Sequence, residues 1–145
     1  MNVRKAEMAD VSAAAFMAAQ LWPDTPAEEH AATLREVIGS PGGAVFFAEN
    51  NGNPVGFAQC QLRHDYVEGT DTSPVGYLEG MYVKEAFRKH GYASQLMRAC
   101  EDWARAEGCM EFASDCELGN EESLAFHLKL GFKEANRIIC FAKSL

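Results

Sequence analysis

The strongest constraint on the fold is the stretch from Val75 to Leu96, where a strand, a basic turn and a helix follow one another. Apolar residues alternate from Val75 to Val83, as in a strand, and recur at helical spacing from Ala93 to Ala106. A helix N-terminus presents free N–H groups and the positive end of the helix dipole. The turn before it also contains Arg88, Lys89 and Gly91. We therefore expect the turn to bind an anion such as a phosphate.

This turn lacks the lysine-serine pair of a Walker loop and the repeated glycines of the dinucleotide fingerprint, which argues against nucleotide hydrolysis. The alternative to an anion site is a solvated basic turn before a surface helix. A chain of 145 residues with 48% hydrophobic content suits one domain over residues 1–145. Hydrophobic periodicity and turn residues predict strands at 2–6, 44–48, 55–62, 75–83, 110–115, 132–136 and 138–143, and helices at 11–21, 26–38, 93–106 and 121–129.

Charge and composition exclude several classes of protein. A formal net charge of -8 argues against a nucleic-acid partner and suits cationic ligands. The five cysteines and four histidines are scattered without metal-ligand spacing, so we predict no metal site. No apolar run is long enough to cross a bilayer. Glu7 and Asp10 interrupt the only segment similar to a secretory signal, so we expect a cytoplasmic protein without a membrane partner.

Two carboxylates are candidates for chemistry. Glu79 lies in the middle of the apolar strand, where a carboxylate needs a purpose or a partner. Asp115 ends a later strand, and strand ends are where α/β sheets usually bind ligands. The alternatives are a buried ion pair or exposed sheet face for Glu79 and a simple turn or cap for Asp115.

The spacing Arg88-x-x-Gly91-x-Ala93 resembles the pyrophosphate loop of the GNAT superfamily of acyl-CoA-dependent N-acyltransferases. Val83, Phe87, Leu96, Asn120 and the segment Leu130-Gly131-Phe132 also lie where that family has them. The resemblance implies an α/β (α+β) fold, with a mixed, mostly antiparallel central sheet flanked by helices, and acetyl-CoA as cosubstrate. It also implies the residues that would bind acetyl-CoA: Met81, Tyr82, Val83, Arg88, Lys89, His90, Gly91, Tyr92, Ala93, Ser94 and Asn120.

A closer resemblance is to the aminoglycoside 6'-N-acetyltransferases. The matching segments, in order, are Gln20 to Pro23, Arg63 to Val67, Ser73 to Val75, Leu78 to Gly80 and Ala113 to Asp115. This resemblance implies that the acceptor site is lined by Trp22, Tyr66, Glu79 and Asp115. Without it, Trp22 could be a core anchor and Tyr66 an exposed loop aromatic.

The resemblance further implies direct attack in a ternary complex. Glu79 would be the general base, Asp115 would bind or help to deprotonate the acceptor, and the N–H of Met81 would face the thioester carbonyl. Many members of the family have a tyrosine that protonates the leaving thiolate, where this chain has His127. His127 is either that general acid or a helix-face residue without such a role.

The leading functional hypothesis is an aminoglycoside 6'-N-acetyltransferase that confers antibiotic resistance. The alternatives are a related enzyme acting on a polyamine or a peptide N-terminus, and a non-catalytic acyl-CoA-binding module. The predicted last strand, within Arg137 to Lys143, could complete its own sheet or exchange with a partner, and the resemblance favours a homodimer.

Overall fold

The sheet is built from five strands in their order along the chain, β1-β2-β3-β4-β5, and a computed structural model describes residues 2–145. The strands are β1 (Asn2–Lys5), β2 (Gly43–Asn50), β3 (Asn53–Arg63), β4 (Val75–Val83) and β5 (Phe112–Ser114). The first four pair antiparallel, whereas β5 runs parallel to β4. The expected mixed, mostly antiparallel sheet is confirmed.

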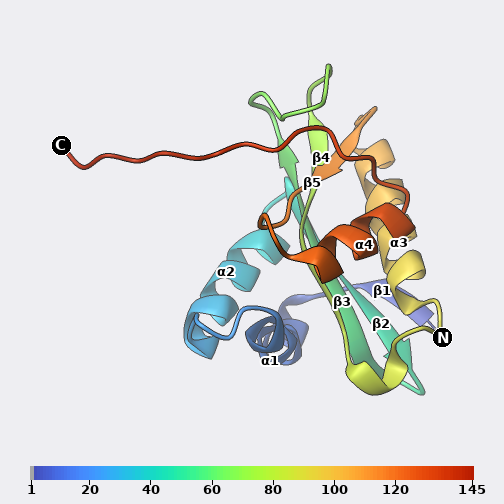
Figure 1. The fold of residues 1–145 in the computed structure, drawn as a ribbon. Helices are drawn as coiled ribbons and strands as arrows, with labels where there is room; N and C mark the ends of the chain where they lie inside the picture. Colours follow the sequence, from blue (N-terminus) through green and yellow to red (C-terminus); the bar gives the residue numbers. More distant parts are fainter. Residues whose placement is uncertain (1) are drawn as a thin grey trace.

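Helices cover both faces of this sheet (Figure 1). On one face lie α1 (Val11–Leu21) and α2 (Ala27–Gly39), and on the other lie α3 (Tyr92–Ala106) and α4 (Glu121–Lys129). Two short 3-10 helices, η1 (Met8–Asp10) and η2 (Glu85–Phe87), precede α1 and α3. None of the described helices is long and apolar enough to span a membrane.

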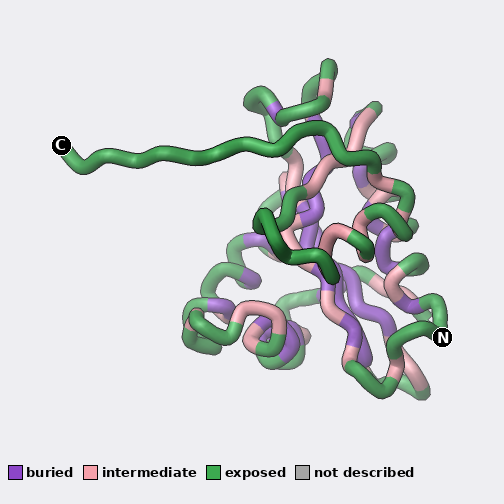
Figure 2. The backbone as a smooth tube through the Cα atoms, viewed as in Figure 1, coloured by how far each residue is buried: buried purple, intermediate pink, exposed green. Residues whose placement is uncertain are grey.

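Two apolar layers hold the helices to the sheet, because alternate residues of a strand point to opposite faces. Phe47 and Phe57 pack with Met17 and Leu34 under α1 and α2. On the opposite face, α3 contributes a buried stripe that meets β3 and β4. Its members are Tyr92, Leu96, Met97 and Cys100. The three central strands, β2, β3 and β4, are accordingly the most buried part of the chain (Figure 2).

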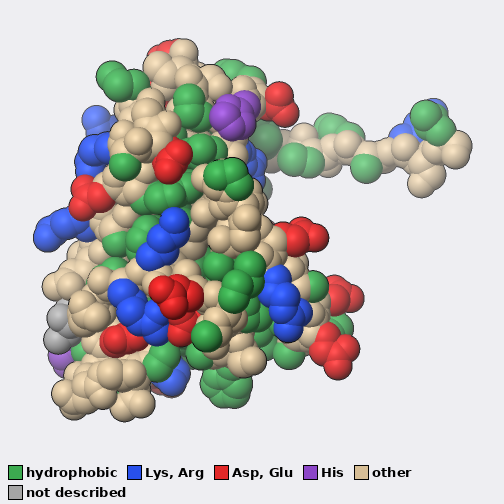
Figure 3. Space-filling view, turned by 180° about the vertical axis from the view of Figure 1, so that it is seen from behind, with side chains coloured by type: hydrophobic (Ala, Val, Ile, Leu, Met, Phe, Trp, Pro, Cys, Tyr) green, Lys and Arg blue, Asp and Glu red, His purple; other side chains and the backbone are tan. Residues whose placement is uncertain are grey.

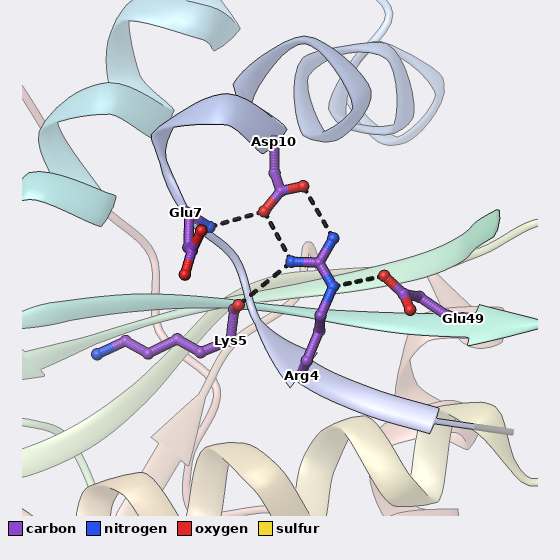
Figure 4. Close-up of polar contacts among 5 residues, drawn as sticks. All are labelled: Arg4, Lys5, Glu7, Asp10 and Glu49. Carbon is purple, nitrogen blue, oxygen red and sulfur yellow. Dashed lines mark hydrogen bonds and ion pairs between the residues drawn. The ribbon is translucent and has the colours of Figure 1, made fainter. Parts of the chain in front are cut away.

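Arg4 ties the sheet edge to the start of the first helical layer (Figure 4). Its Nη1 and Nη2 each donate to one carboxylate oxygen of Asp10, both at 2.8 Å, and its Nε donates to Glu49 on β2. Asp10 also accepts from the backbone N–H of Glu7. These contacts, led by that from Arg4, lower the pKa of Asp10 to about 2.

The second helix begins one residue later than predicted, because Pro26 is the N-cap of α2 and lies outside the helix. Asp10 is the N-cap of α1, but its side chain does not cap the helix because it is bound to Arg4 and to the N–H of Glu7. The larger correction concerns the C-terminus, where the predicted strands at 132–136 and 138–143 do not form.

The segment from Lys133 to Leu145, here called the tail, is extended and has no neighbouring strand among residues 2–145. An extended segment without a pairing partner is not a strand. The tail crosses the loop after β3, where Asn136 donates to Glu68, and then leaves the body of the molecule (Figure 1). The sequence thus correctly indicates extended backbone but not the absence of a pairing strand.

Candidate functional site

Glu79 owes its position to a β-bulge in β4. Gln59 of β3 pairs with Gly80, and the next residue, Cys60, pairs with Leu78, so Glu79 has no partner across the ladder. A bulge inserts one extra residue and redirects its side chain. Glu79 is consequently half-buried in an otherwise apolar strand, and its carboxylate meets the guanidinium of Arg63.

Two side chains, Arg63 and Tyr77, connect the two candidate carboxylates. Arg63 donates from Nη2 to both oxygens of Glu79, at 3.0 and 3.3 Å. The Cζ atom of Arg63 lies 3.4 Å from the ring centroid of Tyr77, a cation–π contact. The hydroxyl of Tyr77 donates to the carboxylate of Asp115. Burial, followed by the Asp115 carboxylate, raises the pKa of Tyr77 above its ordinary value, so this phenol remains a donor.

The two aromatic candidates differ in their surroundings. Trp22 is half-buried, stacks on His30 with ring centroids 5.8 Å apart, and covers Gly80 so closely that a Cβ there would lie 2.4 Å from its ring. It therefore packs against β4 next to Glu79. Tyr66 lies in the loop after β3 with 77% of its surface exposed. Neither aromatic residue forms a hydrogen bond with Arg63, Glu79, Tyr77 or Asp115 within residues 2–145. Tyr66 and Arg63 nevertheless line the same cavity.

His127 belongs to a second hydrogen-bonded chain, on the opposite face of the sheet. Its Nδ1 lies 2.7 Å from the carbonyl oxygen of Ser123, and its Nε2 lies 2.8 Å from Oγ of Ser114. Oγ of Ser114 in turn lies 3.1 Å from the carbonyl oxygen of Leu78. His127 therefore faces the junction of β4 and β5, and is not a solvated residue of the outer helix face.

Beyond the short pairing of β4 with β5, one edge of β4 has no neighbouring strand within residues 2–145. Their pairing runs from Gly76 and Phe112 to Leu78 and Ser114, and then β5 ends while β4 continues to Val83. The backbone of β4 from Gly80 to Val83 pairs with β3 but has no partner on its other edge among residues 2–145. Such an edge can accept an extended ligand as a strand accepts its neighbour. Met81 and Val83 are buried there and Tyr82 is half-buried.

The basic turn leads from this open edge into α3. Arg88 donates from Nε to the carbonyl oxygen of Val83 at 2.8 Å, and its Cζ lies 5.6 Å from the ring centroid of Tyr82. Its two terminal nitrogens make no hydrogen bond within residues 2–145. Lys89 and Gly91 adopt left-handed backbone, with φ of 63° and 86°. A Cβ on Gly91 would meet nothing within 4 Å, so glycine serves here by its φ alone.

The first turn of α3 is not capped by a side chain, since Gly91 is its N-cap. The amides of Tyr92, Ala93 and Ser94 therefore have no partner inside the helix. Arg88, Lys89, His90, Gly91 and Ser94 are exposed, Ala93 is half-buried and Tyr92 is buried. The turn thus presents free amides beside exposed cationic residues, which is what the predicted anion site requires.

Asn120 is the N-cap of α4 and accepts the backbone N–H of Ser123 through its side-chain oxygen at 3.1 Å. Its side-chain NH₂ remains available as a donor. Asn120 is thus a cap as well as a candidate ligand-binding residue.

A cavity of about 1120 Å³ lies between β5, α4, the loop after β3 and the start of the tail. Arg63, Tyr66, Tyr77, Asp115 and His127 line it, whereas Glu79 and Trp22 do not. Seven carboxylates and three cationic side chains line the cavity. Two of the three cations, Lys133 and Arg137, belong to the tail, so the only cation contributed by the sheet is Arg63. The cavity suits a cationic ligand.

The sequence alone predicts no role for three residues of the site: Arg63, Tyr77 and Ser114. Arg63 and Ser114 fall inside segments that match the aminoglycoside enzymes, and this was their only signal. Tyr77 lies two residues before Glu79 on the same strand, but its contact with Asp115 joins two strands far apart in the sequence. Local patterns do not predict such contacts.

Comparison with known proteins agrees with this geometry. Residues 13–132 match the family model described as Acetyltransferase (GNAT) family. An aminoglycoside N(6')-acetyltransferase type 1 from Serratia marcescens is 41% identical over 126 residues, 86% of each chain. One of the same name from Stenotrophomonas maltophilia is 41% identical over 147 residues, covering 99% of this chain and 94% of the other.

Solved structures give the same result. The structure of AAC(6')-Iy in complex with the bisubstrate analogue CoA-S-monomethyl-acetylneamine has a TM-score of 0.94 at 38% identity, over 99% of this chain and 98% of the other. The apo aminoglycoside 6'-N-acetyltransferase AAC(6')-IG from Acinetobacter haemolyticus has a TM-score of 0.95 at 34% identity, over 100% and 99% of the two chains. With its parallel β4–β5 junction, its uncapped α3 and these relatives, the chain belongs to the GNAT family of acetyltransferases.

Proposed function

We propose that residues 1–145 act as one domain that transfers the acetyl group of acetyl-CoA to the 6'-amine of aminoglycosides, and so confers resistance to them. The observation that carries this proposal is the pair of carboxylates, Glu79 and Asp115, joined through Arg63 and Tyr77 beside an acidic cavity. Aminoglycosides carry several ammonium groups, which carboxylates and aromatic faces bind. The relatives that match the chain carry this activity in their names.

On the acceptor side, Asp115 binds an ammonium group of the drug, and Tyr66 and Trp22 offer ring faces to its sugars. The exposure of Tyr66 and Asp115 on the cavity supports this role. Trp22 contributes through its packing on Gly80, the residue that follows Glu79.

The reaction is a direct attack without a covalent enzyme intermediate. The lone pair of the neutral 6'-amine forms the new N–C bond at the thioester carbon, and the C–S bond then breaks. Glu79 receives the proton that the amine loses, through one water, and Asp115 assists by holding the acceptor. The N–H of Met81 polarises the thioester carbonyl.

On the cosubstrate side, the open edge of β4 from Met81 through Tyr82 to Val83 pairs with the pantetheine arm. The pyrophosphate is held by the turn and the first amides of α3, with Asn120 as a donor from α4. The free terminal nitrogens of Arg88 and the uncapped helix start support this assignment. The turn residues concerned are Arg88, Lys89, His90, Gly91, Tyr92, Ala93 and Ser94.

His127 is the general acid that returns a proton to the leaving thiolate. Its Nδ1 lies within hydrogen-bonding distance of the Ser123 carbonyl oxygen and its Nε2 within hydrogen-bonding distance of Ser114, which holds the ring at the β4–β5 junction. This arrangement supports a catalytic histidine at the position where many family members have tyrosine.

The tail supports a homodimer in which each copy supplies a strand to the other. Ile138, Ile139 and Phe141 are 62%, 78% and 91% exposed, and Figure 3 shows hydrophobic side chains along the projecting tail. A second copy would cover them and pair the backbone. Light scattering of the full chain should give a dimer mass, and the double variant Ile139→Asp, Phe141→Asp should give a monomer. A full chain that is monomeric at every concentration would contradict the dimer.

A cytoplasmic location completes the proposal, because acetyl-CoA is a cytosolic metabolite. All five cysteines are free thiols, which is typical of proteins in reducing compartments.

The decisive test is thiol release from acetyl-CoA by the purified protein with kanamycin, tobramycin or spermidine as acceptor. Mass spectrometry and NMR then locate the acetyl group. We expect turnover with the aminoglycosides and modification of the 6'-amine. Turnover with spermidine alone would show that the acceptor is a polyamine and not an aminoglycoside. Acetyl-CoA binding without turnover would show that the protein is a non-catalytic acyl-CoA-binding module.

A further inference from the structure

We propose that Arg63 is a specificity-determining residue whose guanidinium occupies, in the free protein, the position that an acceptor ammonium group takes beside Glu79. An acceptor must displace this internal cation, and only an acceptor with several positive charges does so readily. The inference rests on the proposed function, because it assigns the choice of acceptor class to one residue of the same site.

The contacts of Arg63 are those by which proteins bind ammonium groups. Its Nη2 lies 3.0 and 3.3 Å from the two oxygens of Glu79, and its Cζ lies 3.4 Å from the centroid of the Tyr77 ring. A carboxylate on one side and an aromatic face on the other is a general solution for binding organic cations. Arg63 therefore fills a cation-binding position with a cation from the protein itself.

Arg63 is weakly held. The Nε and Nη1 atoms of Arg63 make no hydrogen bond within residues 2–145, and 43% of its side chain is exposed. It is the last residue of β3, so no following strand residue fixes it. Ion pairs with this exposure contribute little to stability, and an acceptor can displace Arg63 at small cost.

The positive charge of Arg63 also opposes the binding of a cationic ligand in the cavity that Arg63 lines. Seven carboxylates surround the cavity, and Arg63 is the only cation there that comes from the sheet. Two unit charges about 6 Å apart in a partly solvated site change a binding constant by roughly tenfold. A monoamine meets this repulsion with its single charge. A polycation offsets it, because its other ammonium groups bind carboxylates such as Asp115.

The test compares kanamycin with 6-amino-6-deoxyglucose, a sugar that carries a single amine at the corresponding carbon. Calorimetry with CoA present gives Kd for both ligands, and steady-state assays give kcat and KM. We expect Arg63→Met to tighten monoamine binding about tenfold and kanamycin binding about twofold. Measured beside Kd, kcat with kanamycin separates an effect of Arg63 on binding from an effect on catalysis.

Two controls separate displacement from other effects. Lys133→Met removes another cavity cation that makes no ion pair with Glu79, and should change neither Kd by more than about twofold. Arg63→Lys keeps the charge and should resemble wild type. A melting temperature within a few degrees of wild type identifies folded variants, and Arg63→Gln replaces Arg63→Met if the latter does not fold.

The inference is overturned if Arg63→Met weakens binding of both ligands, or leaves the ratio of the two Kd values unchanged. It is also overturned if kcat falls with Kd unchanged, because Arg63 then positions Glu79 for catalysis. Since Kd is measured without turnover, a wild-type protein that binds kanamycin but does not acetylate it rejects the proposed function and still tests Arg63.

Discussion

Arg4 and Arg63 both pair with carboxylates across the sheet, but they use their guanidinium groups differently. All three nitrogens of Arg4 donate to carboxylates, two to Asp10 and one to Glu49, and these partners come from η1 and β2 (Figure 4). Arg63 uses one nitrogen, on Glu79 alone, and lays its flat face on Tyr77.

The difference separates an ion pair that holds the fold from one that can be exchanged. Arg4 has no nitrogen left for a ligand, and it joins segments that would otherwise be free to separate. Arg63 keeps two nitrogens unused on the wall of a cavity. The number of unused donors on a charged side chain therefore distinguishes a structural role from a functional one in this molecule.

The largest expected effect comes from removing the carboxylate that Arg63 holds. Glu79→Gln should lower kcat/KM for kanamycin by about 10²- to 10⁴-fold, the contribution of a general base. The matched control is Glu49→Gln, which removes a carboxylate from the Arg4 cluster and should leave kcat/KM within about twofold. Steady-state kinetics on both variants, with calorimetric CoA binding as a check on the fold, measure this contrast. Equal losses in the two variants would remove the distinction between the clusters.

The next effect concerns the histidine on the other face of the sheet. His127→Asn should lower kcat by roughly 10- to 100-fold, since the leaving thiolate then loses its acid. A thioester whose thiol has a low pKa needs no acid to leave, and it should restore most of the rate. If the defect is the same with both thioesters, His127 acts only by holding α4.

The Arg4 cluster should affect stability and not catalysis. Arg4→Met leaves Asp10 and Glu49 without their cation, and should lower the free energy of unfolding by about 1–2 kcal/mol. Urea denaturation measures this change, with Arg63→Met as the partner variant, expected to cost less than about 0.5 kcal/mol. A greater loss of stability from Arg63→Met would make Arg63 the structural arginine.

The smallest effect is a pH dependence. Arg4 lowers the pKa of Asp10 to about 2 from an ordinary value of 3.8, so the native state favours the ionised form. Its contribution is fully present above about pH 4 and is lost as the pH falls through about 2. Between pH 4 and 2, Asp10→Asn should lose less stability than wild type, by about 0.5–1 kcal/mol after allowance for solvent screening. Identical acid denaturation of the two proteins would contradict this assignment.

Much of the fold could be predicted because its signals are local. The bounds of β4 and α4 match those predicted, and the left-handed Gly91 follows from a glycine at the start of an amphipathic helix. The residues of the tail favour extended backbone, and the sequence therefore predicts strands there. Whether an extended segment pairs depends on a neighbour, which local sequence does not contain.

The site was predictable in its residue types but not in its connections. Glu79 stands out as a charge within an apolar strand, and the family resemblance indicates Asp115 and His127. The contacts from Arg63 to Glu79 and from Tyr77 to Asp115 depend on the register of β3, β4 and β5. Register is set by packing across the whole sheet and has no single-residue signature.

The unpaired residue in β4 is an addition that the sheet itself does not require. Leu78 and Met81 face α3 together although three positions separate them, because Glu79 is the extra residue between them. Deleting Glu79 would restore regular alternation with Leu78 and Met81 still on the same face of the sheet. The extra residue instead gives the strand a carboxylate at a position where a regular strand would have none, between the acceptor half and the cosubstrate half of β4.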